Sequence, residues 1–229
     1  MSDTDRVAKK SFVVTLMLFA GQLAGVALLV AALWQLGAAG WGERIWLAGA
    51  LATLVIRVPF AVKVRGNTIV KARKDAMERA TLTAMFVTML VLPTLHLATP
   101  ALEFAAYTLP GRAWIAGAVL QLPYLWLFWR SHADLGRNWS PTLEVREDHK
   151  LVTGGIYRHV RHPMYSAIWL GAIAQPLLIQ NWIAGPPVLL AFLAMYLTRV
   201  PKEEALMRDR FGDAYHAYAG RTGRLLPKL

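Results

Sequence analysis

The sequence predicts an all-α, polytopic integral membrane protein with about six (five to six) transmembrane helices. Two observations on composition predict this class: 56% of the 229 residues are hydrophobic and only 17% are charged, whereas soluble domains carry about 45–50% apolar and about 25% charged residues. A third observation is that the charges are clustered between long apolar runs. The chain has no cysteine, which excludes a disulfide framework, a thiolate zinc site and a cysteine nucleophile.

Long apolar runs give the positions of the predicted membrane helices. A helix needs roughly 20 mainly apolar residues, with about 17–25 tolerated, to cross the hydrocarbon core of a bilayer. The predicted spans are 12–36, 45–62, 81–99, 113–129, 164–180 and 185–200. The first run is too long for the core of a signal peptide, so it is predicted to be a retained span. The last two runs are short and joined by a tight turn; they form a hairpin, and whether residues 164–200 cross the whole bilayer stays open.

The basic residues predict the orientation of these spans. If six spans alternate across the membrane, only Arg44 and Arg112 of the 25 Lys and Arg residues lie on one side, and all the others lie on the opposite side. Cytoplasmic connections carry the excess of basic residues. The sequence therefore predicts cytoplasmic N- and C-termini in the bacterial inner (cytoplasmic) membrane. The flanking positions also account for the net charge of +11, so nucleic-acid binding is not predicted.

Two polar segments interrupt the apolar pattern in the second half of the chain. The first lies between the predicted spans that end at 129 and begin at 164, and it is dense in His, Arg and Tyr. The second is the group Glu203-Glu204 after the last span. The charge pattern places both on the cytoplasmic side, and polar groups at a membrane boundary are costly unless they serve a ligand or each other. The sequence therefore predicts a cytoplasmic polar pocket between the two segments.

Side-chain spacing within these segments leaves alternatives open. His159 and His162 are three residues apart, but the residue before a proline is pushed away from helical geometry, so no metal site is predicted. Arg199 and Glu203 are four residues apart and share a helical face if Pro201 does not end the helix. Their pair is either part of the pocket or an ordinary ion pair. Glu203 and Glu204 should point about 100° apart, so one is predicted to face the ligand and the other water.

Two connecting segments carry weaker predictions. The cytoplasmic connection 63–80 is predicted to be a solvated loop that becomes helical from Thr68 onward. The stretch 201–219 is amphipathic, and it is predicted to lie at the membrane surface or to pack on the first polar segment.

A set of short motifs follows in a defined order in the C-terminal half. They are LVTGGIY at 151–157, RHPMY at 161–165, Glu203-Glu204, Phe211-Gly212, Tyr215, Tyr218 and Leu226-Pro227. Over residues 142–229 this combination resembles the signature of the isoprenylcysteine carboxyl methyltransferase family, which is grouped with phospholipid methyltransferase-like integral membrane enzymes. The resemblance implies N-terminal transmembrane helices at 1–130 and a C-terminal methyltransferase region at 131–229. That region would contain a cofactor-binding segment, a helical hairpin and an amphipathic C-terminal helix.

What the resemblance implies about chemistry is methyl transfer from S-adenosyl-L-methionine (SAM). The cofactor-binding positions that it implies are Thr142, His149, Lys150, Leu151, Val152, Tyr157, His162, Pro163, Met164, Tyr165 and Glu203. Thr142 is shorter than the glutamine that the family places there. Arg199 falls at the position of a substrate-contacting arginine. Arg199 and His162 are therefore the catalytic candidates, with His162 removing a proton if the acceptor is an amine or a thiol.

The acceptor implied by the resemblance is a lipophilic small molecule or a lipidated protein, methylated on a carboxylate such as a prenylcysteine-type C-terminal carboxyl. In-line transfer of a methyl group needs alignment more than an acid/base pair, which agrees with the absence of an obvious catalytic dyad. Two other enzyme functions stay open: N-methylation of a phospholipid amine, and NADPH-dependent reduction of a sterol- or enone-type lipid. A membrane scaffold or transporter is the non-enzymatic alternative. Of the ionisable residues only His96 lies well inside a predicted span, which disfavours transport.

Overall fold

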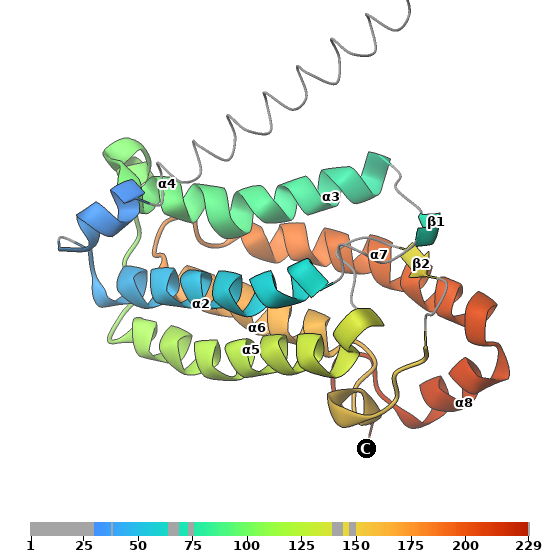
Figure 1. Ribbon diagram of the computed structural model, residues 1–229. Helices are drawn as coiled ribbons and strands as arrows, with labels where there is room; N and C mark the ends of the chain where they lie inside the picture. The colour runs from blue at the N-terminus through green and yellow to red at the C-terminus, as the bar shows by residue number, and fades with distance from the viewer. Residues whose placement is uncertain are drawn as a thin grey trace, which may run out of the picture.

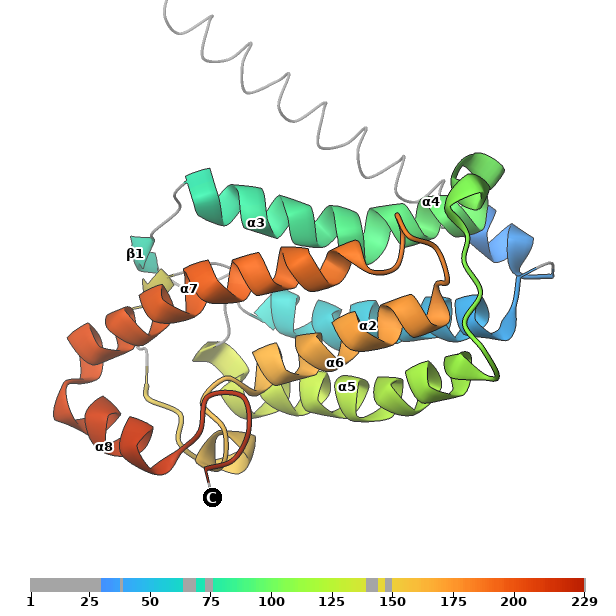
Figure 2. The same ribbon diagram turned by 180° about the vertical axis from the view of Figure 1, so that it is seen from behind.

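The computed structural model describes residues 30–37, 39–63, 69–72, 76–138, 144–146 and 150–228. Five long helical stretches make up most of this part of the chain (Figures 1 and 2). They are α2 (Trp41–Lys63), the run of α3 (Ala76–Phe86), η2 (Val87–Val91) and α4 (Leu92–Ala98), then α5 (Ala113–Leu135), α6 (Pro163–Leu178) and α7 (Pro187–Phe211). The shorter elements are η1 (Gln35–Gly37), η3 (Pro100–Ala105), η4 (Gly136–Asn138), η5 (Gly155–Arg158), α8 (Asp213–Arg221) and the strands β1 (Ile69–Ala72) and β2 (Glu144–Arg146).

The long helices form a bundle with two main packing groups. α5 packs chiefly against α6 and α2, whereas α3 packs chiefly against α7. A buried apolar cluster around Trp46 and Leu178 joins α2 to α6 at one end of the bundle. A second cluster around Met85, Phe192 and Met195 joins α3 to α7. The bundle therefore has an α2–α5–α6 side and an α3–α7 side, and α6 contacts α7 between them.

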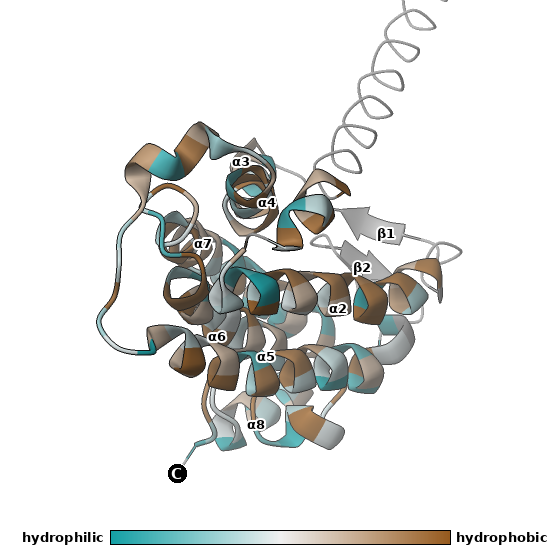
Figure 3. Cartoon of the chain, turned by 90° about the vertical axis from the view of Figure 1, so that its left-hand side faces the viewer, coloured by the Kyte–Doolittle hydropathy of each residue, from teal (hydrophilic) through white to brown (hydrophobic). Residues whose placement is uncertain are grey.

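The apolar runs of the sequence coincide with the long helices of the structure. The stretches Trp41–Val62 and Ala76–Ala98 are each long and apolar enough to cross a membrane. Hydrophobic segments are frequent along the long helices (Figure 3), and large apolar side chains such as Val55, Leu122 and Leu190 are 69–73% exposed. Apolar side chains on the outer face of a helix bundle are typical of a protein that lies in a membrane. The membrane character is confirmed, whereas the six-span topology stays a prediction, and the span 12–36 lies mostly outside the described residues.

The predicted hairpin of the last two runs is confirmed as α6 and α7. Asn181 is fully buried in the turn between them. Its Oδ1 accepts the backbone N–H groups of Ile183 and Ala184, both at 3.0 Å. Its Nδ2 donates to the carbonyl oxygen of Leu102 at 2.6 Å. One amide side chain thus fixes the turn and ties it to the segment before α5.

The connection after α2 contains a strand where the sequence predicted a helix. The segment 63–80 is not helical from Thr68, because Ile69–Ala72 forms β1, which pairs antiparallel with β2, and the helix begins only at Ala76. The β-branched pair Ile69-Val70 suits a strand, and its partner strand lies in the distant polar segment, so local spacing did not reveal it.

Pro201 lies inside α7, which runs on to Phe211. A proline removes one backbone hydrogen bond, and the remaining helix contacts are sufficient to keep α7 continuous.

Candidate active site

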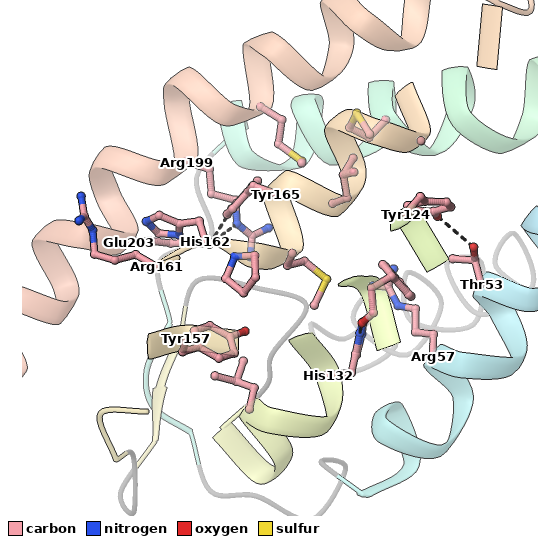
Figure 4. A pocket seen from close by; sticks show the side chains of 18 of the residues that line it. Thr53, Arg57, Tyr124, His132, Tyr157, Arg161, His162, Tyr165, Arg199 and Glu203 are labelled. Atoms are coloured by element: carbon pink, nitrogen blue, oxygen red, sulfur yellow. Dashed lines mark hydrogen bonds and ion pairs between the residues drawn. The ribbon is translucent and has the colours of Figure 1, made fainter. Parts of the chain in front are cut away.

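A cavity of about 690 Å³ lies inside the bundle and is lined by residues from α2, α3, α5, α6, α7 and the segment before η5. Its wall near η5 and the start of α6 is rich in charged and hydroxyl groups (Figure 4). Its wall between α2 and α3 is apolar and includes Ala50, Leu54, Leu82, Met85 and Met89. A single cavity therefore joins a polar end to an apolar compartment.

Most of the predicted site residues line this one cavity. They are Lys150, Leu151, Val152, Tyr157, His162, Pro163, Met164, Tyr165, Arg199 and Glu203. The predicted positions Thr142 and His149 lie outside the described residues. Segments that are 50 residues apart in sequence are brought together because α6 and α7 are a hairpin whose open end faces η5. The roles of the individual residues stay predictions.

Glu203 is the centre of the polar end. Its Oε1 accepts a hydrogen bond from the Tyr165 hydroxyl at 2.8 Å and another from Arg199 Nε at 2.8 Å. His162 Nδ1 lies 3.7 Å from the other carboxylate oxygen. The predicted pairing of Arg199 with Glu203 along one helical face is therefore confirmed, and it forms part of the cavity wall rather than an exposed ion pair.

A second carboxylate at the polar end was missed by sequence reasoning. Glu78, on the first turn of α3, is 5% exposed, and its Oε1 lies 3.7 Å from Arg199 Nη1. One guanidinium thus lies between two carboxylates, Glu78 and Glu203, so these three side chains carry a net charge of −1. In the sequence Glu78 is one of several charged residues in the connection 63–80, just before an apolar run. Nothing in that pattern distinguishes it from its charged neighbours.

We predicted that one of Glu203 and Glu204 faces the ligand and that the other faces water. The prediction of a water-facing side chain is wrong, because both carboxylates have protein partners. Glu204 is 3% exposed. Its carboxylate accepts bonds from Arg161 Nε at 3.2 Å and Arg224 Nη2 at 2.8 Å, and His162 Nε2 lies 3.3 Å away. Burial alone would raise the pKa of Glu204, but bonds from His162 and Arg224 and the charge of Arg161 outweigh it and lower that pKa to about 2.

One partner of Glu204, Arg224, belongs to a segment that we call the C-terminal strap, residues 219–226. The backbone N–H groups of Arg161 and His162 donate to the carbonyl oxygens of Gly223 and Arg224 at 2.8 and 2.9 Å. The Arg161 guanidinium also donates to carbonyl oxygens of the strap. The strap therefore holds the start of the RHPMY motif in place. Tyr218 donates to the carbonyl oxygen of Tyr157, so the packing of the amphipathic C-terminal stretch on the first polar segment is confirmed.

Replacing Glu204 with glutamine is expected to destabilise the fold by about 3 kcal/mol, because it leaves the buried Arg161 guanidinium without its carboxylate. The midpoint of thermal unfolding at neutral pH should fall by about 6–12 °C, measured in detergent against Glu103→Gln, the same change at an exposed position. Because the pKa of Glu204 in the folded protein lies below its ordinary value of 4.5, the wild-type advantage is complete above about pH 4.5 and is lost as the pH falls toward about 2. An equal midpoint for both variants at neutral pH would contradict this role.

The segment between the strands and α6 is anchored to α5. Asp134 accepts the backbone N–H of Ile156 at 2.8 Å and is paired with Arg130 at 2.6 Å. Gly155 has φ +59°, and an added Cβ there would collide with the Asp134 carboxylate, so both the conformation and the close approach require glycine. Tyr157 is buried, and burial raises the pKa of its hydroxyl. This tyrosine therefore stays neutral, and its hydroxyl donates a hydrogen bond to the carbonyl oxygen of Ser131 at 3.3 Å.

A second polar group lines the cavity away from the motif residues, and sequence reasoning missed it. This inner polar group consists of Thr53 and Arg57 of α2 and Tyr124 and His132 of α5 (Figure 4). The hydroxyls of Thr53 and Tyr124 are 2.9 Å apart. His132 is fully buried, with Nδ1 2.8 Å from the carbonyl oxygen of Phe128. Arg57 had been counted among the basic residues of a cytoplasmic connection, because only the fold shows that it lines a cavity.

The histidine pair of the first polar segment is separated by the fold. His162 lies in the cavity wall, whereas His159 is exposed and its Nε2 accepts a bond from the Arg158 guanidinium at 2.8 Å. Across the described ranges no group of three or more His, Cys, Asp or Glu side chains is placed to hold a metal ion.

Comparisons with known proteins point to the same region of the chain. Residues 119–209 match the model of the isoprenylcysteine carboxyl methyltransferase (ICMT) family. The chain is similar to a probable protein-S-isoprenylcysteine O-methyltransferase of Oryza sativa subsp. indica, at 31% identity over 94 residues, which are 40% of this chain and 49% of that protein. It is also similar to the protein-S-isoprenylcysteine O-methyltransferase of Schizosaccharomyces pombe, at 33% identity over 83 residues, which are 36% of this chain and 35% of that protein.

One further relative is named for metal resistance and not for methyl transfer. The cobalt-zinc-cadmium resistance protein CzcN of Cupriavidus metallidurans is 29% identical over 117 residues, which are 51% of this chain and 52% of that protein. The chain thus spans about half of the length, or less, of the curated relatives that it matches.

Proposed function

Residues 119–209 of this chain are an ICMT-like region, and from this premise we propose that the protein transfers a methyl group from SAM to a carboxylate on a lipophilic acceptor. The observation that carries the proposal is the cavity, which joins a polar end, lined by charged and hydroxyl side chains, to an apolar compartment. SAM is polar and cationic at sulfur, whereas the proposed acceptor is apolar with one anionic end. A cavity with two such ends suits this pair of molecules.

The residues at the polar end fit SAM. Glu203 supplies a carboxylate in the cavity wall, and a carboxylate favours a cation or a charged hydrogen-bond donor beside it. Among the described residues, no hydrogen bond is donated by the backbone N–H groups of Leu151 and Val152, which line the cavity. Both residues are half-buried, and a ligand that displaces water from their amides has to replace its hydrogen bonds, so these amides are natural partners for the polar atoms of a nucleoside or an amino acid.

The roles we propose follow from these contacts. Glu203 would accept a hydrogen bond from a hydroxyl or ammonium group of SAM, and Tyr157 and Tyr165 would pack against it. Bound SAM supplies an electrophilic methyl group. Arg199 would contact the acceptor carboxylate by a charge-assisted bond while it stays paired with Glu203. The protein's own contribution is alignment of the two reacting atoms and exclusion of water, because no proton has to move when a carboxylate is methylated.

The acceptor would enter from the side of the apolar compartment. The compartment lies between α2 and α3, which belong to different packing groups of the bundle. Leu54 and Phe86, which line it, are 42% and 59% exposed, so the compartment reaches the apolar outer surface. A prenyl or acyl chain fits such a compartment by the hydrophobic effect, at roughly 0.8 kcal/mol per buried CH₂ group.

One contact favours a second candidate, methylation of a lipid amine. His162 lies 3.7 Å from Glu203 and 3.3 Å from Glu204, so a proton taken from an amine would be stabilised there. The two acceptors give different products, since a methyl ester is hydrolysed by mild base and an N-methyl group is not. We expect the label transferred from methyl-labelled SAM to be base-labile, and a base-stable label would favour the amine.

The first test is binding of SAM and its product S-adenosylhomocysteine to the detergent-purified protein by calorimetry, with NADPH as the control. We expect binding of both sulfur compounds and none of NADPH, because Glu203 would pair with the ammonium group that SAM and its product carry and that NADPH lacks. Binding of NADPH alone would replace the methyltransferase proposal with a lipid reductase, and binding of none of them would remove both.

A further inference from the structure

The cavity has a polar floor at the end of the apolar compartment. On four helical stretches, the floor is formed by the lining residue that is farthest from the polar end. These residues are Trp46 of α2, Leu90 of η2, Gln121 of α5 and Gln175 of α6. Beyond them the bundle is closed by the buried apolar cluster that includes Leu178. Three of the four floor residues thus carry hydrogen-bonding groups, although the compartment above them is mainly apolar.

Two of the polar floor residues are bound to the fold. Gln175 Nε2 donates to the carbonyl oxygens of Thr88 and Ala184, both at 2.8 Å. Trp46 Nε1 donates to Gln175 Oε1 at 3.4 Å, which is longer than an ordinary hydrogen bond. These contacts join α2, η2 and α6 at one level of the bundle and close the compartment there.

Gln121 is the floor residue that the fold leaves unpaired. It is 7% exposed, and its Oε1 is buried without a hydrogen-bond partner among the described residues. Gly49, in the interior of α2, faces it: an added Cβ there would lie 2.8–3.0 Å from the side-chain amide atoms of Gln121. Glycine inside a helix is destabilising relative to alanine, so α2 loses stability at the point where it makes room for this amide.

The next polar side chains along the wall do not supply the missing partner. The Thr53 hydroxyl donates to the carbonyl oxygen of Gly49 at 2.8 Å, so the Tyr124 hydroxyl, 2.9 Å away, donates to Thr53 (Figure 4). Both hydroxyl hydrogens are therefore used within the protein. An unpaired amide in an apolar compartment is costly, and a molecule inside the cavity can remove that cost by pairing with Gln121.

A hydroxyl group suits this amide. The side-chain amide offers one acceptor oxygen and two N–H donors, and a hydroxyl group can donate to the first or accept from the second. A hydrocarbon chain can do neither, so it would leave Gln121 unpaired when it displaces water from the floor.

The helix geometry gives the length of chain that reaches the floor. Along α6, Tyr165 lies at the polar end and Gln175 at the floor, and ten residues of helix span about 15 Å. An extended chain advances roughly 1.2 Å per backbone bond. An acceptor with its carboxylate at the polar end therefore reaches Gln121 after about 12 bonds.

We propose that Gln121 binds a hydroxyl group at the far end of the acceptor chain, so that the preferred acceptors are long-chain carboxylic acids with a terminal hydroxyl group. This inference rests on the proposed function and names the substrate class of the same site. Unsubstituted chains still fit the apolar walls, but they bind less tightly because they leave the amide at the floor unpaired.

The test compares 12-hydroxydodecanoic acid with dodecanoic acid. Binding of each acid to the detergent-purified, full-length protein is measured by calorimetry, with and without S-adenosylhomocysteine, and the ratio of the two dissociation constants is taken for each variant. Gln121→Leu should reduce the preference for the hydroxy acid at least about tenfold, because the hydroxyl then faces an apolar floor. Because every variant is measured in the same detergent, the different partitioning of the two acids into micelles cancels.

Gln180→Leu is the matched control, since Gln180 lies in the turn after α6 and does not line the cavity. S-adenosylhomocysteine should bind both variants with the wild-type affinity, which also checks that they fold. If Gln121→Leu keeps the wild-type ratio as Gln180→Leu does, Gln121 pairs only with internal water and the inference is overturned. It is also overturned if the wild type binds neither acid. A wild type that does not bind S-adenosylhomocysteine would instead remove the proposed function, and the ratio measured without that compound would still decide whether Gln121 binds the hydroxyl group.

Discussion

Replacing Glu203 with glutamine is expected to lower the affinity for SAM by about 10- to 150-fold without unfolding the protein. The neutral amide keeps the size of the side chain but removes the negative charge that Glu203 contributes to the polar end. Charge-assisted hydrogen bonds contribute about 1.5–3 kcal/mol, and each 1.4 kcal/mol is a factor of about ten in affinity. The glutamine also weakens the contacts of Tyr165 and Arg199, both now 2.8 Å from the carboxylate, so its effect reaches the rest of the site.

The measurement is a calorimetric titration with SAM, repeated with S-adenosylhomocysteine, which lacks the sulfonium charge. The sulfonium compound should lose more affinity than the product, because the lost interaction is electrostatic. Asp209→Asn is the control, since Asp209 lies on the exposed side of the same helix. A Glu203→Gln protein that binds SAM as tightly as the control would remove Glu203 from the cofactor site.

Filling the apolar compartment is expected to block long-chain acceptors selectively. Ala50 lies on the cavity face of α2, across from Leu82 and Met89 of the α3–η2 stretch. A tryptophan at position 50 would occupy the space that a farnesyl chain needs, while the polar end would keep its contacts. The ratio of kcat/KM for a farnesylated acceptor to that for a short-chain acceptor should fall by about 100-fold, since a misplacement of 1 Å can reduce a rate by that amount.

The control for this prediction is Ala48→Trp, the same substitution on the exposed side of α2. It should leave the ratio of the two acceptors unchanged, and both variants should bind S-adenosylhomocysteine as the wild type does. Equal losses for long and short acceptors in Ala50→Trp would mean that the compartment between α2 and α3 does not hold the acceptor chain.

The sequence predicted the helices and the motif residues because both are local properties. The apolar runs ending at 62, 99 and 129 lie on helices of the structure within a few residues. A long continuous apolar run avoids water, and in a membrane it satisfies its backbone polar groups by forming a helix. The RHPMY motif and Glu203 were recognised as short strings, and their residues line one cavity. Whether each contacts cofactor or acceptor stays a prediction, because Arg199 and Glu203 share a hydrogen bond.

The residues that were missed depend on contacts between distant segments. Glu78 and Arg57 are single charges near the ends of apolar runs, and in the sequence they look like the topogenic charges around them. Only the packing of α3 on α7 brings Glu78 to Arg199, and only the fold turns Arg57 toward a cavity. The burial of Glu204 was missed because its partners are distant in sequence: Arg161 precedes it by 43 residues, and Arg224 in the strap follows it by 20 residues. The strand at 69–72 was likewise hidden, because its partner is 72 or more residues away.

The C-terminal strap also sets the time at which the site can first exist. A ribosome makes residues 219–226 after all the helices that line the cavity, so a nascent chain can insert those helices before the strap has emerged from the exit tunnel. Until Gly223 and Arg224 arrive, the backbone N–H groups of Arg161 and His162 have not received the carbonyl partners that they hold in the finished fold. The group of arginine side chains around Glu204 is also incomplete until then, because Arg224 belongs to the strap. The polar end of the cavity can therefore reach its finished geometry only after the strap has been synthesised.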